Sequence, residues 1–225
     1  MLPPIPQRMQ QIDETTVGQH FDLETSDHCF YVWEYTAGQR YDFSQTNQLI
    51  SNLKIKPSQI AATPRRGHYK QQAIAHCAAA LRSLIQQSWI EQVGTFVPMP
   101  SSKIPGHQDY DDRIHRILNS AFAGFNADIR PLLEQTVNTA ADHESSERMS
   151  YDELRAITRI NPVAAALPSR ANIALVDDVL NSGKHFKVAQ DLLSLRFPGV
   201  PIVGIFVSRC VRVNPFAAGA GAPAP

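Results

Sequence analysis

Two adjacent carboxylates, Asp177 and Asp178, come directly after a short apolar run from Ile173 to Val176. A continuous apolar run of this length is typical of a strand that is buried on both faces of a parallel sheet. In open parallel sheets, ligands bind beyond the carboxyl ends of the strands. The sequence therefore predicts an acidic pair at the ligand-binding edge of a sheet.

The segment after the acidic pair has the composition of a phosphate-binding turn. Residues 179–183 (VLNSG) lead into an expected helix that begins near Lys184. Such a turn offers backbone N–H groups, a hydroxyl and the positive end of a helix dipole. Lys184, His185 and Lys187 lie in or near the first turn of this helix, where positive charge opposes the dipole unless an anion is bound. They favour a bound anion; the alternative is that these side chains simply reach into solvent.

The elements expected around this segment alternate between strands and helices. Apolar residues at three- and four-residue spacing predict helices over 74–85, 114–122 and 184–195. Strands are predicted over 29–35, 95–97, 173–176 and 200–207. The strand, loop, helix and strand from 173 to 207 form the βαβ unit of a parallel sheet. We therefore predict an α/β fold with a central, mainly parallel sheet flanked by helices and an N-terminal extension.

Composition divides the chain into three parts. Residues 1–60 are expected to form the N-terminal extension, with short strands and a helix, and residues 61–216 the main domain. Residues 217–225 are rich in alanine, glycine and proline and are expected to be a disordered tail. A long, poorly patterned insertion spans about 126–168 in the main domain. Insertions of this kind are usually functional lids or disordered linkers, and its place before the acidic pair favours a lid.

Residues 173–183 (IALVDDVLNSG) resemble the motif with which type I phosphoribosyltransferases bind 5-phosphoribosyl-1-pyrophosphate (PRPP). In that family, a hydrophobic strand leads to two acidic residues, a hydrophobic residue and a hydroxyl-rich turn with glycine. The resemblance implies a phosphoribosyltransferase-type Rossmann-like fold. It also implies that Asp177 and Asp178 hold the two ribose hydroxyls, directly or through Mg²⁺.

The same resemblance assigns the turn to the 5-phosphate of PRPP. The residues implied to wrap this phosphate are Asn181, Ser182, Gly183, Lys184 and His185. Asn181 and His185 stand where the family usually has threonine. This departure removes two hydroxyl donors but leaves the backbone N–H groups, so it puts catalysis in question more than phosphate binding.

A second segment is similar to the pyrophosphate loop of the family, and closest to its competence-associated branch. It is the strand end from Phe96 to Pro100, followed by Ser101, Ser102 and Lys103. The resemblance implies that Lys103 faces the pyrophosphate, with the N–H groups of both serines beside it. The segment from about 107 to 166 would then correspond to the family's flexible loop and its flanking helix. Arg148 and Arg155 are the candidates there for reaching the pyrophosphate.

Together these resemblances imply a protein that binds PRPP and Mg²⁺ and transfers phosphoribose to a nitrogen acceptor, releasing pyrophosphate. The expected catalytic residues are Lys103, Asp177 and Asp178. The main alternative is a sensor, regulator or partner subunit that binds PRPP, or another nucleotide or sugar phosphate, without turnover. A pure interaction scaffold with an accidental motif is a third reading. A phosphoacceptor receiver domain is disfavoured. In that class the acidic pair lies near the start of the chain, whereas Asp177 and Asp178 lie near the end of this one.

Charge and hydropathy exclude several other classes. The 225 residues carry 21 basic and 21 acidic side chains, which gives no overall attraction for nucleic acid or acidic membranes. No apolar segment is long enough to span a membrane, and the proline-broken N-terminus lacks the apolar core of a secretion signal. We therefore expect a cytoplasmic protein that binds neither membranes nor nucleic acid. A homodimer or a complex with a partner protein is left open.

Two smaller features complete these expectations. Cys29, Cys77 and Cys210 are far apart and odd in number, so we expect reduced, mostly buried thiols. A basic cluster, residues 65–67 with Lys70, is expected to be a solvated face of the molecule.

Overall fold

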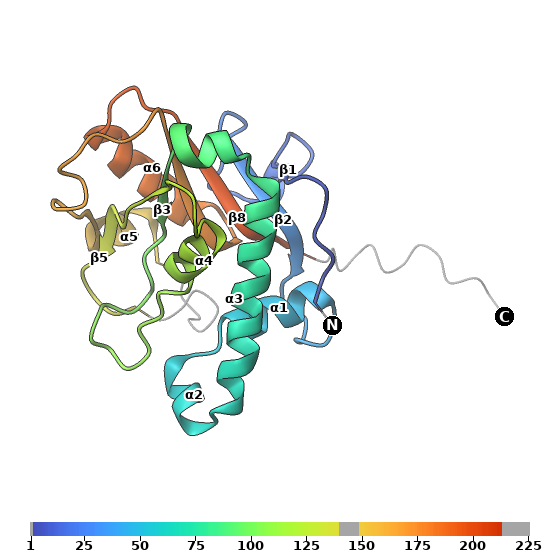
Figure 1. Ribbon diagram of the computed structural model, residues 1–225. Coiled ribbons are helices and arrows are strands. Elements are labelled where there is room, and N and C mark those ends of the chain that lie inside the picture. The colour runs from blue at the N-terminus through green and yellow to red at the C-terminus, as the bar shows by residue number, and fades with distance from the viewer. Residues whose placement is uncertain (1, 140–148, 213–225) are drawn as a thin grey trace.

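The computed structural model describes residues 2–139 and 149–212. Its centre is a six-stranded sheet with the strand order β1-β2-β8-β7-β3-β4 (Figure 1). The strands are β1 (Gln10–Gln11), β2 (Cys29–Thr36), β3 (Gly94–Pro98), β4 (Asp128–Ile129), β7 (Asn172–Leu180) and β8 (Ile202–Val211). Every neighbouring pair is parallel except β1 and β2. The predicted α/β class with a mainly parallel central sheet is confirmed.

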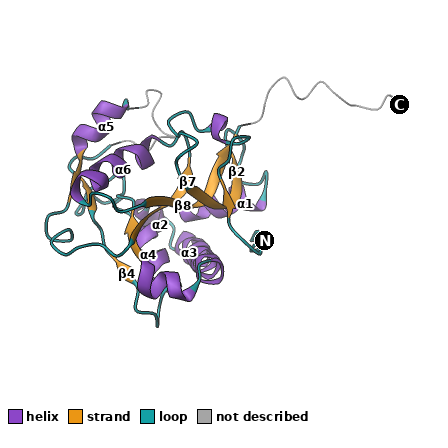
Figure 2. Ribbon diagram, turned by 90° about the horizontal axis from the view of Figure 1, so that it is seen from above, coloured by secondary structure: helices purple, strands orange, loops and turns teal. Residues whose placement is uncertain are grey.

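Helices cover both faces of this sheet. They are α1 (Gln45–Leu53), α2 (Pro57–Ala62), α3 (Arg65–Leu84), α4 (Arg113–Ala121), α5 (Tyr151–Ile157) and α6 (Lys184–Arg196). Figure 2 shows α3 and α4 on one side of the strands and α5 and α6 on the other. A 3₁₀ turn at Val17–Gln19, a π turn at Trp89–Val93 and the antiparallel pair β5 (Leu133–Gln135) and β6 (Thr158–Ile160) complete the described elements.

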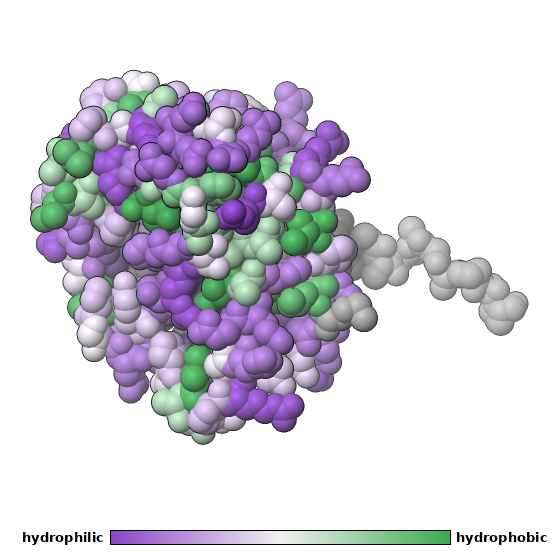
Figure 3. Space-filling view, in the orientation of Figure 1, coloured by the Kyte–Doolittle hydropathy of each residue, from purple (hydrophilic) through white to green (hydrophobic). Residues whose placement is uncertain are grey.

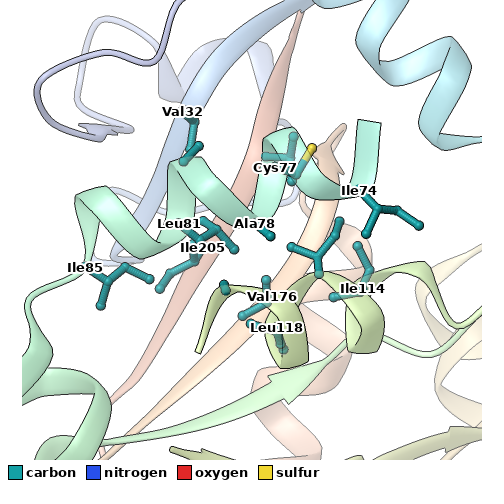
Figure 4. Close-up of a cluster of buried hydrophobic side chains, with 14 of the residues drawn as sticks. Val32, Ile74, Cys77, Ala78, Leu81, Ile85, Ile114, Leu118, Val176 and Ile205 are labelled. Carbon is teal, nitrogen blue, oxygen red and sulfur yellow. The ribbon is translucent and has the colours of Figure 1, made fainter. Parts of the chain in front are cut away.

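The predicted apolar stripes of α3 and α4 are the sides of these helices that pack on the sheet. Figure 4 shows Cys77 and Leu81 of α3 and Leu118 of α4 between the helices and the strand residues Val176 and Ile205. Burying one large aliphatic side chain contributes roughly 1.5–3 kcal/mol. Because side chains alternate along a strand, the packing of Val176 places Asp178 on the same face of β7 and Asp177 on the other.

The predicted end of the acidic strand was wrong. The apolar run predicts an end at Val176, but β7 continues to Leu180 because its pairing with β8 persists as far as Leu180 and Arg209. The hydroxyl of Ser208 also donates to the carbonyl of Asp178 (3.3 Å). The acidic pair therefore lies inside the strand, and successive side chains of a strand point to opposite faces.

The N-terminal region supplies part of the same sheet. The predicted strand over 29–35 is β2, which pairs in parallel with β8 from Cys29 to Thr36.

Within 2–139 and 149–212, no helix is long and apolar enough to cross a membrane. Figure 3 shows a surface on which hydrophilic residues predominate and hydrophobic ones are scattered. All three cysteines are buried thiols, as predicted.

Short elements, among them α5, occur in the poorly patterned insertion, for which the sequence predicts no helix or strand. Helix α5 has only seven residues, too few to show an apolar period, and a capping box fixes its start. The Ser150 hydroxyl accepts from the N–H of Glu153 (3.2 Å), and the Glu153 carboxylate accepts from the N–H of Ser150 (2.7 Å).

Candidate functional site

A cleft of about 970 Å³ lies at the carboxyl edge of the sheet, where β2, β3, β7 and β8 end. It brings together most of the residues singled out from the sequence, namely Ser101, Ser102, Asp177, Asp178, Asn181, Ser182, Gly183, Lys184 and His185. In the part of the chain that the structure describes, Lys103 and Arg155 do not line this cleft. Arg148 lies outside the described residues.

The turn before α6 has the geometry of an anion site. Gly183 is the N-cap of α6, with a left-handed φ of 98° and no side chain to bond the first-turn N–H groups. N–H groups of a first helical turn have no acceptor within the helix. The N–H of Lys184 donates to the Ser182 hydroxyl (3.3 Å). First-turn N–H groups point out of the helix end, so the turn can present donors to a ligand in the cleft.

Residues 20–23 of the N-terminal region contact this turn. The N–H of Asp22 donates to the carbonyl of Ser182 (2.9 Å), and the His20 ring contacts the carbonyl of Asn181. Burial lowers the pKa of His20, so its ring is neutral near pH 7. A Cβ atom added at Gly183 would lie 2.6 Å from Leu23. The shape of the turn therefore depends on a segment more than 150 residues away in the sequence.

Gly183→Ala is expected to destabilise the protein more than Gly199→Ala. Both glycines have a left-handed φ (98° and 78°), but only Gly183 has a neighbour in the way. The backbone strain alone costs about 1–3 kcal/mol, and at Gly183 the contact with Leu23 adds to it. Urea unfolding of the two variants measures the difference. Equal losses would show that the segment around Leu23 does not constrain the turn.

Asp178 is held by two basic residues. Its carboxylate accepts from Arg113 at Nε (2.8 Å) and Nη2 (2.6 Å), and Lys54 Nζ lies 3.4 Å away. Arg113 also bonds Asp111 (3.0 Å), which in turn bonds Lys70 (2.7 Å). We call these five residues the charge network. Burial acts to raise the pKa of Asp178, but Arg113 and Lys54 outweigh it and hold this pKa well below its usual range.

The expectation that Lys70 lies on a solvated face was wrong. Its side chain is only 2% exposed, and its ammonium donates to Asp111 and to the carbonyls of Leu53 (2.8 Å) and Ile55 (2.7 Å). Burial lowers the pKa of Lys70 despite the attraction of Asp111. All three donors of the ammonium are used, which explains how a lysine is accommodated among apolar neighbours.

Asp177 is in a different environment from its neighbour. Arg113 and Lys54 bond Asp178 on the face covered by α3 and α4, and strand alternation places the Asp177 side chain on the other face. Its carboxylate accepts the N–H of Asp178 (2.8 Å). Burial, together with the nearby charge of Asp178, raises the pKa of Asp177 to about 7. The two carboxylates are therefore not equivalent, and Asp177 is the one available to a ligand.

Three of the lysines considered from the sequence have protein partners. Lys103 Nζ donates to the carbonyl of Thr139 (2.7 Å), and Lys184 Nζ donates to that of Met149 (2.6 Å). Lys187 lies 3.1 Å from both oxygens of Asp27. The carboxylate explains the charge of Lys187 near the helix start without a bound anion.

The acidic pair does not form a metal site by itself. Across residues 2–139 and 149–212, no group of three His, Cys, Asp or Glu side chains is arranged to hold a metal ion. Mg²⁺, however, is usually held by one or two carboxylates together with substrate phosphates and water. Asp177 satisfies that smaller requirement, so the residues fit a magnesium ion that arrives with a phosphorylated ligand.

The charge of the cleft differs from that of the whole chain. The chain has no net charge, yet the cleft is lined by six Lys or Arg residues and two Asp residues. The basic ones are Lys54, Lys56, Arg66, Arg113, Lys184 and Arg212. A cleft lined mostly by one sign of charge attracts ligands of the opposite sign. The cleft therefore favours anions.

No protein-family model matches the chain, and no curated protein matches it. The interpretation of the site therefore rests on its own residues.

The sequence did not predict the charge network or the contacts of residues 20–23 with the turn. One signal was present, because Lys70 lies four residues before Ile74 on the apolar stripe of α3.

Proposed function

We propose that the cleft binds PRPP with Mg²⁺ and that the protein transfers its phosphoribosyl group to a nitrogen acceptor. The observation that carries this proposal is the turn at Gly183, the N-cap of α6, which lines a predominantly basic cleft directly after the acidic strand. In this proposal the Ser182–Lys184 turn takes the 5-phosphate and Asp177 takes the ribose. Ser101 and Ser102, in the loop that follows β3, take the pyrophosphate.

The reaction would be a displacement at C1 of the ribose. The acceptor nitrogen forms a bond to C1, the C1–O bond to pyrophosphate breaks, and the electron pair leaves with pyrophosphate. A proton carried by the nitrogen goes to water. Asp177 would stabilise the positive charge that develops on the sugar, and basic groups would stabilise the leaving group. Bound magnesium would supply Lewis-acid stabilisation of the pyrophosphate.

A PRPP-binding sensor or regulator without turnover is the second candidate. It is favoured by the contacts of two of the three residues that we expected to be catalytic. Asp178 is bonded by Arg113 and Lys54, and Lys103 is bonded by Thr139. Binding needs only the turn and Asp177, whereas turnover would need more of these groups.

The melting temperature with PRPP and MgCl₂ tests binding, because a ligand selective for the folded state must raise it. At a ligand concentration of 100 times Kd we expect a rise of roughly 5–10 °C. Ribose 5-phosphate is expected to give a smaller rise, since it lacks the pyrophosphate. Release of pyrophosphate with any of a panel of nitrogen heterocycles identifies the enzyme; binding without release identifies the sensor. No rise with PRPP would contradict both.

A further inference from the structure

His20 is a buried side chain that the proposed reaction does not use. It is 0% exposed, and it contacts the turn without lining the cleft. Its Nδ1 atom contacts the carbonyl of Asn181. A carbonyl oxygen can only accept a hydrogen bond, so Nδ1 must carry a proton. His20 is therefore a hydrogen-bond donor to the turn.

The other ring nitrogen of His20 is in a different situation. Nε2 is buried, and within residues 2–139 and 149–212 no group bonds it. Burial, with the charges of Arg209 and Arg212, lowers the pKa of His20, so Nε2 does not carry a second proton near pH 7. A buried polar atom without a partner lowers stability. Packing alone therefore does not explain a histidine at this position, and exceptions of this kind are commonly found where a residue serves a site.

Two consecutive carbonyls of the turn are bonded by the N-terminal region. The carbonyl of Asn181 accepts from His20. The carbonyl of Ser182 accepts from the N–H of Asp22 (2.9 Å). No cis peptide bond occurs within the described ranges, and in a trans peptide the C=O and the following N–H point in opposite directions. The N–H groups of Ser182 and Gly183 therefore both point away from the N-terminal region.

These two N–H groups belong to residues that line the cleft, whereas the two groups that bond the carbonyls come from residues that do not. Successive N–H groups of a turn form a concavity that binds anions. We call the N–H groups of Ser182 and Gly183 the anion cradle. Arg212 also lines the cleft and lies 3.5 Å from the side chain of Asn181, which places a positive charge beside the turn. This arrangement suits the oxygens of a phosphate monoester.

We infer that His20 is a positioning residue of the anion cradle: by donating to the Asn181 carbonyl, its Nδ1–H directs the N–H of Ser182 toward a phosphate monoester in the cleft. This inference rests on the proposed function, since it assigns what orients the site of the 5-phosphate. It requires a donor at position 20 for binding but not for folding. Affinity and stability are therefore expected to respond differently to substitution of His20.

Two substitutions separate the donor from the packing. His20→Leu fills the site without a donor, whereas His20→Asn keeps a donor at the place of Nδ1 in a smaller side chain. Ribose 5-phosphate with MgCl₂ is titrated into each variant by calorimetry at pH 8. We expect His20→Leu to bind about tenfold more weakly or worse, because an orienting hydrogen bond is lost, and His20→Asn to stay within about threefold of the wild type.

The melting temperatures of the free proteins are expected to follow the opposite order. His20→Asn should melt at a lower temperature than the wild type, because the smaller side chain leaves a cavity. His20→Leu should melt close to the wild type, because it removes the unsatisfied Nε2 together with the donor. His28→Leu is the matched control, since His28 is exposed and does not line the cleft. It should change neither the affinity nor the melting temperature.

The tautomer of His20 gives a test on the unaltered protein. Nitrogen-15 NMR of the labelled histidines at pH 8 is expected to find the proton of the His20 ring on Nδ1. A proton on Nε2 would overturn the inference whatever the variants do, because Nδ1 could not then donate to the turn.

The possible failures separate this inference from the proposed function. An affinity that follows the melting temperature across the variants, or a His20→Leu that binds ribose 5-phosphate as the wild type does, overturns the role of His20. A wild type that does not bind ribose 5-phosphate overturns it as well. In each case a rise in melting temperature with PRPP still supports the proposed function. If the variants behave as expected but PRPP does not bind, the role of His20 stands and the proposed function fails.

Discussion

Arg113→Ala is expected to lower the free energy of unfolding by about 3–5 kcal/mol, the usual cost of removing one partner from a buried ion pair. The substitution removes two contacts to Asp178 and one to Asp111, whose side chains are 5% and 8% exposed. Lys54 and Lys70 would each remain with one carboxylate, but neither can replace the guanidinium. Denaturation in urea at pH 7 measures the loss.

Arg159→Ala is the matched control for this prediction. It also removes an arginine from an ion pair, since Arg159 Nε lies 2.7 Å from Glu134, but the two side chains are 66% and 35% exposed. Exposed pairs contribute about 0–1 kcal/mol. If both variants lost the same small amount, the charge network would not be what holds Asp178 in place.

Asp177→Asn is expected to stabilise the free protein above pH 7. The pKa of Asp177 is raised from 3.8 to about 7, so the folded state binds one more proton than the unfolded state between these values. Stability from this group therefore falls as the pH rises from about 4 to 7 and is constant above. A pKa raised from 3.8 to about 7 corresponds to roughly 4 kcal/mol, at about 1.4 kcal/mol for each unit. Because Asp177 is only partly buried, we expect about half of this gain at pH 8, on the order of 2 kcal/mol.

The neighbouring substitution has the opposite sign. The pKa of Asp178 is lowered, so its ionised form stabilises the protein above pH 4, and this contribution is lost only as the pH falls further. Asp178→Asn is therefore expected to destabilise the protein at pH 8. Melting temperatures of both variants and the wild type from pH 4.5 to 8 check the pair. A wild-type protein more stable than Asp177→Asn at pH 8 would contradict the assigned environment of Asp177.

Local pattern was sufficient to predict the layers of the fold. The stripe through Ile74 and Leu81 identified α3, and the apolar runs identified β7 and β8, because periodicity reports which face is buried. The start of α6 at Lys184 followed from the glycine before it. The end of β7 did not follow, since a neighbouring strand, and not the acidic residues themselves, determines how far the pairing continues.

The ion pairs at the site depend on contacts that are distant in sequence. Asp178 is bonded by Lys54 and Arg113, which lie 124 and 65 residues earlier in the chain, so no local spacing indicates the pairing. The contact of Leu23 with Gly183 is equally remote. The sequence could therefore predict which residues gather at the sheet edge, but not which of the two carboxylates is left for a ligand.

Calorimetric titration of PRPP with MgCl₂ into the wild type and Asp177→Asn at pH 8 shows whether the cleft binds PRPP through Asp177. The Asn variant keeps an acceptor for the N–H of Asp178 and is expected to be the more stable protein, so unfolding cannot explain a loss of binding. We expect the wild type to bind and the variant to bind about tenfold more weakly or worse. A wild type that does not bind PRPP would contradict the proposed function. A variant that binds PRPP equally well would contradict the role of Asp177 as a ligand of the ribose.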